Sequence, residues 1–220
     1  MRICTLNFDI ILDIILYIGE RVIMLVYNWD QIIGLNKIKD WLLIKLAQDN
    51  MPQVLMFAGQ PGIGKTSLAK VLACELACLD CPERVREVKD RVIGQSQSTD
   101  CVKIYNMSNL RSNDAINDVK NDLTIGLSTT GRKVIIMDEA HGMTGDQQDY
   151  LLTSFEALDK HVYIIICTTD VNSLRDAFLS RCIVRNFSTP TQSEVKTLIM
   201  NEIQANKLQF NIPINMVLLN

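Results

Sequence analysis

The sequence of 220 residues lacks the features that mark membrane, secreted and repeat proteins. Its first 27 residues are very apolar, but charged side chains interrupt them at Asp9, Asp13, Glu20 and Arg21. No uninterrupted apolar run therefore reaches the roughly 18 to 20 residues that span a membrane. The segment has no small-residue cleavage site of a secretory signal, and no internal repeat follows it. We expect no membrane partner.

The sequence also lacks a strong excess of charge of one sign. Lysine and arginine number 22 against 25 aspartate and glutamate residues, so the formal net charge is −3. This balance argues against a strongly basic nucleic-acid binder, but a local basic patch or a helix N-terminus could still face phosphates. Seven cysteines, an odd number, indicate reduced thiols and an intracellular protein. With 48% hydrophobic residues, we expect a packed core.

Apolar stretches alternate with helical stretches from residue 29 onward. The strand candidates are 53–59, 101–108, 133–140, 161–169 and 183–187, and the helix candidates are 66–79, 112–123, 145–160 and 173–181. Continuous apolar strands separated by helices predict a parallel sheet covered on both faces, which is a three-layer α/β domain. Pro190 then interrupts the pattern, so 188–195 is interpreted as a linker and the start of another helix.

The segment "GQPGIGKTS" at 59–67 fits the phosphate-loop pattern G-x-x-x-x-G-K-[ST] between a strand and a helix candidate. Glycines at these positions permit turns that aim backbone N–H groups at a phosphate, and the helix start adds its positive end. We expect Lys65 to reach the β- and γ-phosphates of ATP and Thr66 to bind Mg²⁺. The other expected nucleotide-binding residues of the loop are Gly59, Gln60, Pro61, Gly62, Ile63, Gly64 and Ser67.

The segment "VIIMDEAH" at 134–141 supplies acidic partners for this loop. We expect Asp138 to hold Mg²⁺ directly or through water, and Glu139 to polarise the attacking water. His141 is expected to face solvent. The next strand ends in "ICTTD" at 166–170, where Thr168 or Thr169 would orient water near the γ-phosphate, although threonine is also common in strands for its β-propensity alone.

These three segments and "LSRC" at 179–182 occur in the order and rough spacing of AAA+ clamp-loader ATPase subunits. Over residues 28–200 the chain resembles the bacterial gamma/tau subunit of DNA polymerase III, the small subunits of replication factor C and phage clamp loaders. The resemblance implies a P-loop AAA+ domain with a five-stranded parallel sheet at 28–188. It further implies an ATPase that loads a sliding clamp onto primed DNA in the cytoplasm of a bacterial or phage-infected cell.

The resemblance also implies roles for single residues. Arg181 would act in trans as an arginine finger in the site of a neighbouring subunit, whereas by itself it would equally suit the C-terminus of its own helix. Thr169 matches the sensor-1 position better than Thr168. The segment that contacts adenine matches Ile32, Ile33 and Gly34.

The partners implied by the resemblance are a sliding clamp, other clamp-loader subunits in a pentameric ring, and primer–template DNA held through its phosphates. Residues 116–129 resemble the helix and turn that dock on the clamp. We expect clamp contacts from Leu123, Ile125 and Leu127, with core packing as the alternative, favoured for Leu123. The candidates for contacts to DNA phosphates are Arg111, Arg132 and Lys133, although exposed basic side chains often only face solvent.

Two departures from the family pattern concern cysteines and the chain ends. The family's bacterial members carry a four-cysteine zinc module, but Cys74, Cys78, Cys81 and Cys101 do not have its spacing, so we expect free thiols rather than zinc. Residues 189–220 match the beginning of a helical lid domain, which we expect to be truncated. Residues 1–27 are interpreted as an apolar extension, either an amphipathic leader helix or, as we favour, sequence that lies upstream of a true start at Met24.

Two alternatives remain open at this point. One is another AAA+ motor of replication or recombination, such as a helicase loader or a branch-migration motor. The other is a ring subunit that serves as a scaffold and does not hydrolyse ATP; such subunits typically lose the phosphate-loop lysine or the acidic pair, which this chain keeps at Lys65, Asp138 and Glu139. The letters "DEAH" do not make a DEAH-box helicase, because the chain has no room for a second motor domain.

Overall fold

The computed structural model describes residues 28–110, 113–124 and 128–205. The described residues from Asn28 to Pro190 belong to one compact unit, and those from Thr191 onward belong to another. In that second unit the structure describes one helix, α8 (Gln192–Ala205). Thr191 and Glu194 form a reciprocal cap at its start, because each side chain accepts a hydrogen bond from the backbone N–H of the other.

The first unit is built on a sheet of five parallel strands in the order β2-β3-β4-β1-β5. This confirms the predicted fold class. The strand order was not predicted, and it places β3 and β4 between β2 and β1. The bounds are β1 (Val54–Ala58), β2 (Val102–Asn106), β3 (Lys133–Asp138), β4 (Val162–Thr168) and β5 (Ile183–Asn186).

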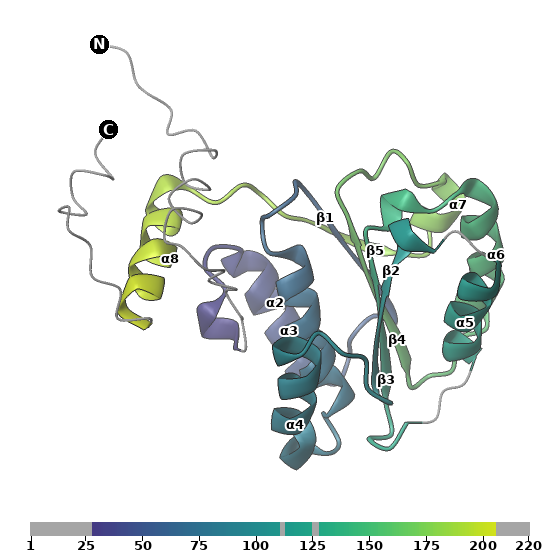
Figure 1. Ribbon diagram of the computed structural model, residues 1–220, viewed down its shortest axis with the longest axis horizontal. Coiled ribbons are helices and arrows are strands. Elements are labelled where there is room, and N and C mark those ends of the chain that lie inside the picture. The colour runs from purple at the N-terminus through teal and green to yellow at the C-terminus, as the bar shows by residue number, and fades with distance from the viewer. Residues whose placement is uncertain (1–27, 111–112, 125–127, 206–220) are drawn as a thin grey trace, which may run out of the picture. The chain divides into compact units, whose positions relative to one another are not determined.

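Helices cover both faces of this sheet, which confirms the three predicted layers (Figure 1). One face carries α2 (Asn36–Ala47), α3 (Lys65–Ala77) and α4 (Val85–Lys89). The other carries α5 (Asn113–Thr124), α6 (Gly145–Glu156) and α7 (Asp176–Leu179). The short turns are the 3₁₀ helices η1 (Trp29–Gln31), η2 (Pro82–Arg84), η4 (Met107–Asn109) and η5 (Ala140–Gly142), and the π-helical turn η3 (Asp90–Gly94).

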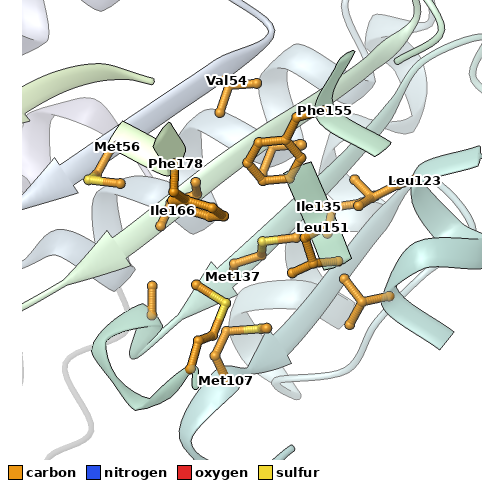
Figure 2. Packing of buried hydrophobic residues seen from close by; sticks show 14 of the residues in the cluster. Val54, Met56, Met107, Leu123, Ile135, Met137, Leu151, Phe155, Ile166 and Phe178 are labelled. Atoms are coloured by element: carbon orange, nitrogen blue, oxygen red, sulfur yellow. The ribbon is translucent and has the colours of Figure 1, made fainter. Parts of the chain in front are cut away.

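The core between the sheet and α5, α6 and α7 is formed by alternate residues of the central strands (Figure 2). Ile135 and Met137 of β3 lie in it beside Leu151 of α6, since successive strand residues point to opposite faces. Phe155 and Phe178 join α6 to α7 with their ring centroids 5.0 Å apart. Burial on both faces explains why the strands are continuous apolar runs. Among the described residues, none of the helices is long and apolar enough to cross a membrane.

Leu123, one of the expected clamp contacts, belongs to this core. It is 1% exposed and packs in the cluster beneath α5, so core packing, the favoured alternative, is confirmed for it. The other two expected clamp contacts, Ile125 and Leu127, lie outside the described residues, as does Arg111.

The expectation that Arg132 and Lys133 contact DNA is wrong. Both side chains are buried at the amino end of β3. Arg132 Nη1 lies 2.6 Å from Asp49 Oδ1 and its Nε lies 2.7 Å from Asp80 Oδ2, while Lys133 Nζ lies 2.6 Å from Asp122 Oδ1. Buried charges need partners of this kind, and these two are used within the domain.

Candidate nucleotide-binding site

The predicted phosphate loop connects β1 to α3 at the carboxyl edge of the sheet. Gly59 lies so close to β5 that an added Cβ would be 2.8 Å from the carbonyl oxygen of Phe187. Gly64 has a φ of +92° immediately before the first residue of α3, a conformation that favours glycine. The loop therefore turns tightly into the N-terminus of a long helix, where backbone N–H groups suit an anion.

Lys65 is buried as the first residue of α3. Its Nζ donates hydrogen bonds to the carbonyl oxygens of Gly59, at 2.9 Å, and Gln60, at 2.7 Å. Burial lowers the pKa of Lys65. The ammonium group is thus positioned inside the loop, where its three N–H donors can exchange carbonyl oxygens for phosphate oxygens.

The structure brings the two expected Mg²⁺ ligands into contact. Thr66 Oγ1 donates to Asp138 and lies 3.1 Å from each of its carboxylate oxygens, although the residues are 72 positions apart. A hydroxyl and one carboxylate fit Mg²⁺, which keeps several waters and takes further oxygens from substrate phosphates. Within the described residues, no group of three or more His, Cys, Asp or Glu side chains is arranged to hold a metal ion.

Glu139 follows β3 in a left-handed backbone conformation, with a φ of +54°. Such a conformation costs roughly 1 to 3 kcal/mol in a residue other than glycine and is typical of functional sites. The backbone N–H of Glu139 donates to Asp138 Oδ1 at 3.0 Å, and its carbonyl oxygen accepts from Ser108 Oγ at 3.3 Å. Its half-exposed carboxylate lies at the same edge as the phosphate loop.

The two threonines at the end of β4 differ. Thr168 is buried, and its hydroxyl donates to the carbonyl oxygen of Asp170 at 2.9 Å. Thr169 is only half-buried, and its Oγ1 lies 3.1 Å from Nδ1 of His141. The geometry therefore favours Thr169, the residue that matches sensor 1, as the side chain available to the site.

Sequence reasoning missed the position of His141. The side chain was expected to face solvent, but it is half-buried between Thr169 and Glu139, whose Oε2 lies 3.4 Å from Nδ1. Only the order of the strands brings the ends of β3 and β4 together, so no local pattern could have revealed this contact.

Ile32, Ile33 and Gly34 lie between η1 and α2. Ile32 is buried and Ile33 half-buried, while Gly34 has a φ of +73°. The preceding η1 is tied to α3 by a hydrogen bond from Trp29 Nε1 to Glu75. This contact connects the expected adenine segment to the helix that follows the phosphate loop.

Arg181 lies at the opposite edge of the sheet, because it precedes β5 and all strands are parallel. Its Nη1 donates to the carbonyl oxygen of Ala177 at 3.3 Å and to Ser180 Oγ at 3.0 Å, and its Nη2 forms an ion pair with Glu156. The side chain is 41% exposed. Arg181 thus caps its own helix and also remains accessible to another chain.

Cysteines 74, 78 and 101 are buried free thiols, and Cys81 is half-buried. A hydrogen bond with the Cys78 side chain lowers the pKa of Cys101 to about 6. These thiols lie away from the phosphate loop, near the amino end of β2 and the C-terminus of α3.

Residues 34–191 match the model of the protein family described as "DNA polymerase III, delta subunit", which is more than half of the chain. The chain belongs to this family. Its AAA+ fold is also that of Thermotoga maritima RuvB, described as a Holliday junction branch migration motor, with a TM-score of 0.60 and 18% identity over 83% of this chain and 55% of that one. At this identity the likeness shows the fold alone.

Several family relatives are subunits of replication machinery. DNA polymerase III subunit gamma/tau of Mycoplasma pneumoniae is 30% identical over 68% of this chain and 22% of its own length. DNA polymerase III subunit tau of Bacillus subtilis is 27% identical over 83% of this chain and 33% of its own length. Replication factor C small subunit 1 of Pyrobaculum islandicum is 29% identical over 73% of this chain and 44% of its own length.

These relatives confirm the predicted resemblance to clamp-loader AAA+ subunits. The chain spans between about a fifth and under half of the lengths of these relatives, from 22% to 44%.

Proposed function

We propose that the chain is an ATPase subunit of a DNA sliding-clamp loader, which couples ATP binding and hydrolysis to loading the clamp onto primed DNA. The observation that carries the proposal is the meeting of the phosphate loop with Asp138 at one edge of the sheet, through the hydroxyl of Thr66. Membership of a DNA polymerase III subunit family supports replication as the setting.

In the binding step, residues 59–67 surround the phosphates with backbone N–H groups, and Lys65 neutralises the β- and γ-phosphates. Thr66 and Asp138 would hold Mg²⁺, which supplies positive charge to the phosphate oxygens when bound. Ile32, Ile33 and Gly34 would contact the adenine base. All three parts lie on or next to α3 and the edge from which it starts.

In the hydrolysis step, water attacks the γ-phosphorus, and the bond from that phosphorus to the bridging oxygen of ADP breaks. Glu139 orients the water and accepts its proton. The hydroxyl of Thr169 donates a hydrogen bond to a γ-phosphate oxygen. The products are ADP and inorganic phosphate. Lys65 stabilises the charge that builds up on the departing phosphate oxygens.

The partner assignments belong to the same proposal. Arg181 would enter the nucleotide site of a neighbouring subunit in a ring, a pentamer by resemblance, and stabilise charge on the γ-phosphate there. Its accessible guanidinium and its place at the edge opposite to its own phosphate loop support action in trans. The clamp would dock near 116–129, and DNA would be held through phosphates.

The Glu139→Gln variant tests the chemistry. We expect ATP turnover to fall about 10³-fold, because a general base is lost, while ATP affinity stays unchanged because the amide keeps the size of the carboxylate. Turnover of radiolabelled ATP and binding of a fluorescent ATP analogue measure the two effects. Glu83→Gln, at an exposed position in η2, is the matched control. Equal turnover in parent and Glu139→Gln would refute the assignment.

A further inference from the structure

A single nitrogen links the expected catalytic carboxylate to the expected sensor. Nδ1 of His141 lies 3.1 Å from Thr169 Oγ1 and 3.4 Å from Glu139 Oε2. The two partners come from the ends of neighbouring strands, β3 and β4. The imidazole therefore lies between the group that would contact the γ-phosphate and the group that would activate water.

The turn that carries His141 is firmly seated. Gly142 N–H donates to the carbonyl oxygen of Glu139 at 2.9 Å, and Ala140 beside the histidine is fully buried. Gly142 also packs directly on η4, where an added Cβ would lie 2.4 Å from Ser108 Oγ. These contacts fix the backbone on both sides of His141, so the ring is presented to Glu139 and Thr169 by a rigid element.

In a neutral imidazole, Nδ1 cannot accept a hydrogen bond from Thr169 and at the same time donate one to Glu139. Nδ1 either carries a hydrogen and donates, or lacks one and accepts. When the Thr169 hydroxyl donates to Nδ1, the nitrogen has no hydrogen to give to Glu139. When Thr169 instead donates to another oxygen, Nδ1 can carry the hydrogen and donate to the carboxylate, which is the stronger, charge-assisted bond.

We propose that His141 is a positioning residue that couples Thr169 to Glu139. Thr169 donates to a γ-phosphate oxygen when ATP is bound, so Nδ1 no longer has to accept from it. The imidazole can then take its other neutral tautomer, in which Nε2 gives its hydrogen to water and Nδ1 takes one from water, and Nδ1–H donates to Oε2 of Glu139. That bond orients the carboxylate and leaves Oε1 for the attacking water. The coupling rests on the proposed ATPase function and deepens it, because it makes base orientation depend on the presence of the γ-phosphate.

His141→Leu tests the proposal by removing the nitrogen while keeping much of the volume. We expect kcat for ATP to fall on the order of tenfold, because a misoriented base loses rate rather than substrate affinity. KM for ATP should stay within about twofold, which separates positioning from binding. His161→Leu is the matched control, since it changes the other histidine of the chain at an exposed site before β4.

Two further variants keep the test independent of simple misfolding. His141→Asn places an amide N–H near the position of Nδ1 and should recover most of the lost kcat. In a double-mutant cycle, His141→Leu combined with Thr169→Val should be no slower than the slower single variant, since both break the same link. A purely structural histidine would give losses that multiply, and no rescue by asparagine.

The outcomes separate the two proposals. If the parent chain hydrolyses ATP and His141→Leu leaves kcat unchanged, the coupling alone is overturned. The same holds if the parent is active and the losses of the two single variants multiply in the double variant. A parent chain that binds ATP but never hydrolyses it, under any of the conditions that support clamp loading, would overturn the proposed function and the coupling with it.

Discussion

The two edges of the sheet hold their charged side chains in different ways. At the amino edge, Arg132 and Lys133 are buried and lie 2.6 to 2.7 Å from carboxylates. At the carboxyl edge, Asp138 and Glu139 are half-exposed, and their side-chain partners lie 3.1 and 3.4 Å away. Both edges are rich in charge, but Arg132 and Lys133 are held closely by their carboxylate partners, whereas Asp138 and Glu139 have partners that can be exchanged.

This difference separates structural charges from functional ones. A buried charge with short ion pairs is costly to uncouple, because the remaining partner is left without solvent or counter-ion. Longer contacts to a hydroxyl or an imidazole are weaker, so phosphate, Mg²⁺ or water can replace them. The carboxyl edge is therefore suited to binding and chemistry, and the amino edge fixes the strands that carry it.

One arginine at the amino edge departs from its neighbours. The side chain of Arg181 is 41% exposed, against 8% for Arg132, and its carboxylate partner Glu156 is itself 55% exposed. Exposed ion pairs contribute only about 0 to 1 kcal/mol. Arg181 can therefore leave Glu156 at little cost, as a finger acting in a neighbouring subunit must.

The largest effect should follow from Arg181→Ala. In an assembled ring we expect hydrolysis at the neighbouring site to fall about 10³-fold, because arginine fingers contribute that much to phosphoryl transfer. The variant's own ATP affinity should not change. Turnover by mixed rings with one variant subunit measures the effect. The control is Arg175→Ala, which removes another exposed arginine. Arg175 lies at the start of the same helix and forms an ion pair with Asp149 of α6.

If Arg181 only caps its helix, both arginine variants will give the same small loss of thermal stability. Ring turnover per assembled complex will then match the parent. That result would show that the exposed side chain of Arg181 has no part in hydrolysis at a neighbouring site.

A smaller effect is expected for the two buried lysines. Lys65→Ala should weaken ATP binding at least about 100-fold, since two charge-assisted contacts of about 1.5 kcal/mol each are lost. Lys133→Ala should lower stability but leave ATP affinity of the folded protein unchanged, because its partner Asp122 lies on α5. Fluorescence titration with an ATP analogue distinguishes them. Equal ATP affinities for the two variants would contradict the claim that Lys65 serves nucleotide binding whereas Lys133 serves the fold.

The amino edge is tested by Asp49→Asn combined with Asp80→Asn. Arg132 then loses both of its carboxylate partners, and we expect the free energy of unfolding to fall by about 2 kcal/mol. This lies below the usual cost of breaking a buried pair, because the two aspartates are more than half exposed. Urea denaturation measures the change, and Asp40→Asn on the exposed side of α2 is the control. ATP turnover per folded molecule should stay the same.

The smallest effect is a pH dependence of the same network. Hydrogen bonds from Arg132 lower the pKa of both Asp49 and Asp80. A carboxyl group whose pKa is lower in the folded state contributes stability above its unfolded pKa of about 4, and loses it as the pH falls through the folded value. The parent should lose stability more steeply than the double asparagine variant below about pH 4. Urea denaturation of both proteins at pH 7 and pH 3 measures the difference. An equal loss of unfolding free energy in the parent and in the variant would contradict this prediction.

The sequence predicted the carboxyl edge better than the amino edge, for a physical reason. The phosphate loop is a contiguous segment, and parallel strands bring their carboxyl ends together, so Thr66 and Asp138 could be expected to meet. The partners of Arg132 lie 83 and 52 positions away and belong to no motif. Lys133 has a nearer partner, Asp122, 11 positions before it, but that pair also belongs to no motif. Burial of a charge depends on such partners, and for that reason Arg132 and Lys133 were wrongly assigned to DNA.

His141 shows the same limit at the carboxyl edge. Its contact with Thr169 depends on β3 and β4 being neighbours, and the alternation of strands and helices predicts a parallel sheet without giving the strand order. Leu123 illustrates the converse, because core packing was its favoured alternative and it lies in the core with Ile116 and Val119 of the same helix.

The most direct test of the account is ATP turnover by the chain, alone and with primed DNA plus its cognate sliding clamp. We predict that turnover rises only when DNA and clamp are both present, and that Glu139→Gln removes the rise while ATP still binds. Turnover that is indifferent to DNA and clamp, in protein that binds ATP normally, would contradict the proposal that this nucleotide site drives clamp loading.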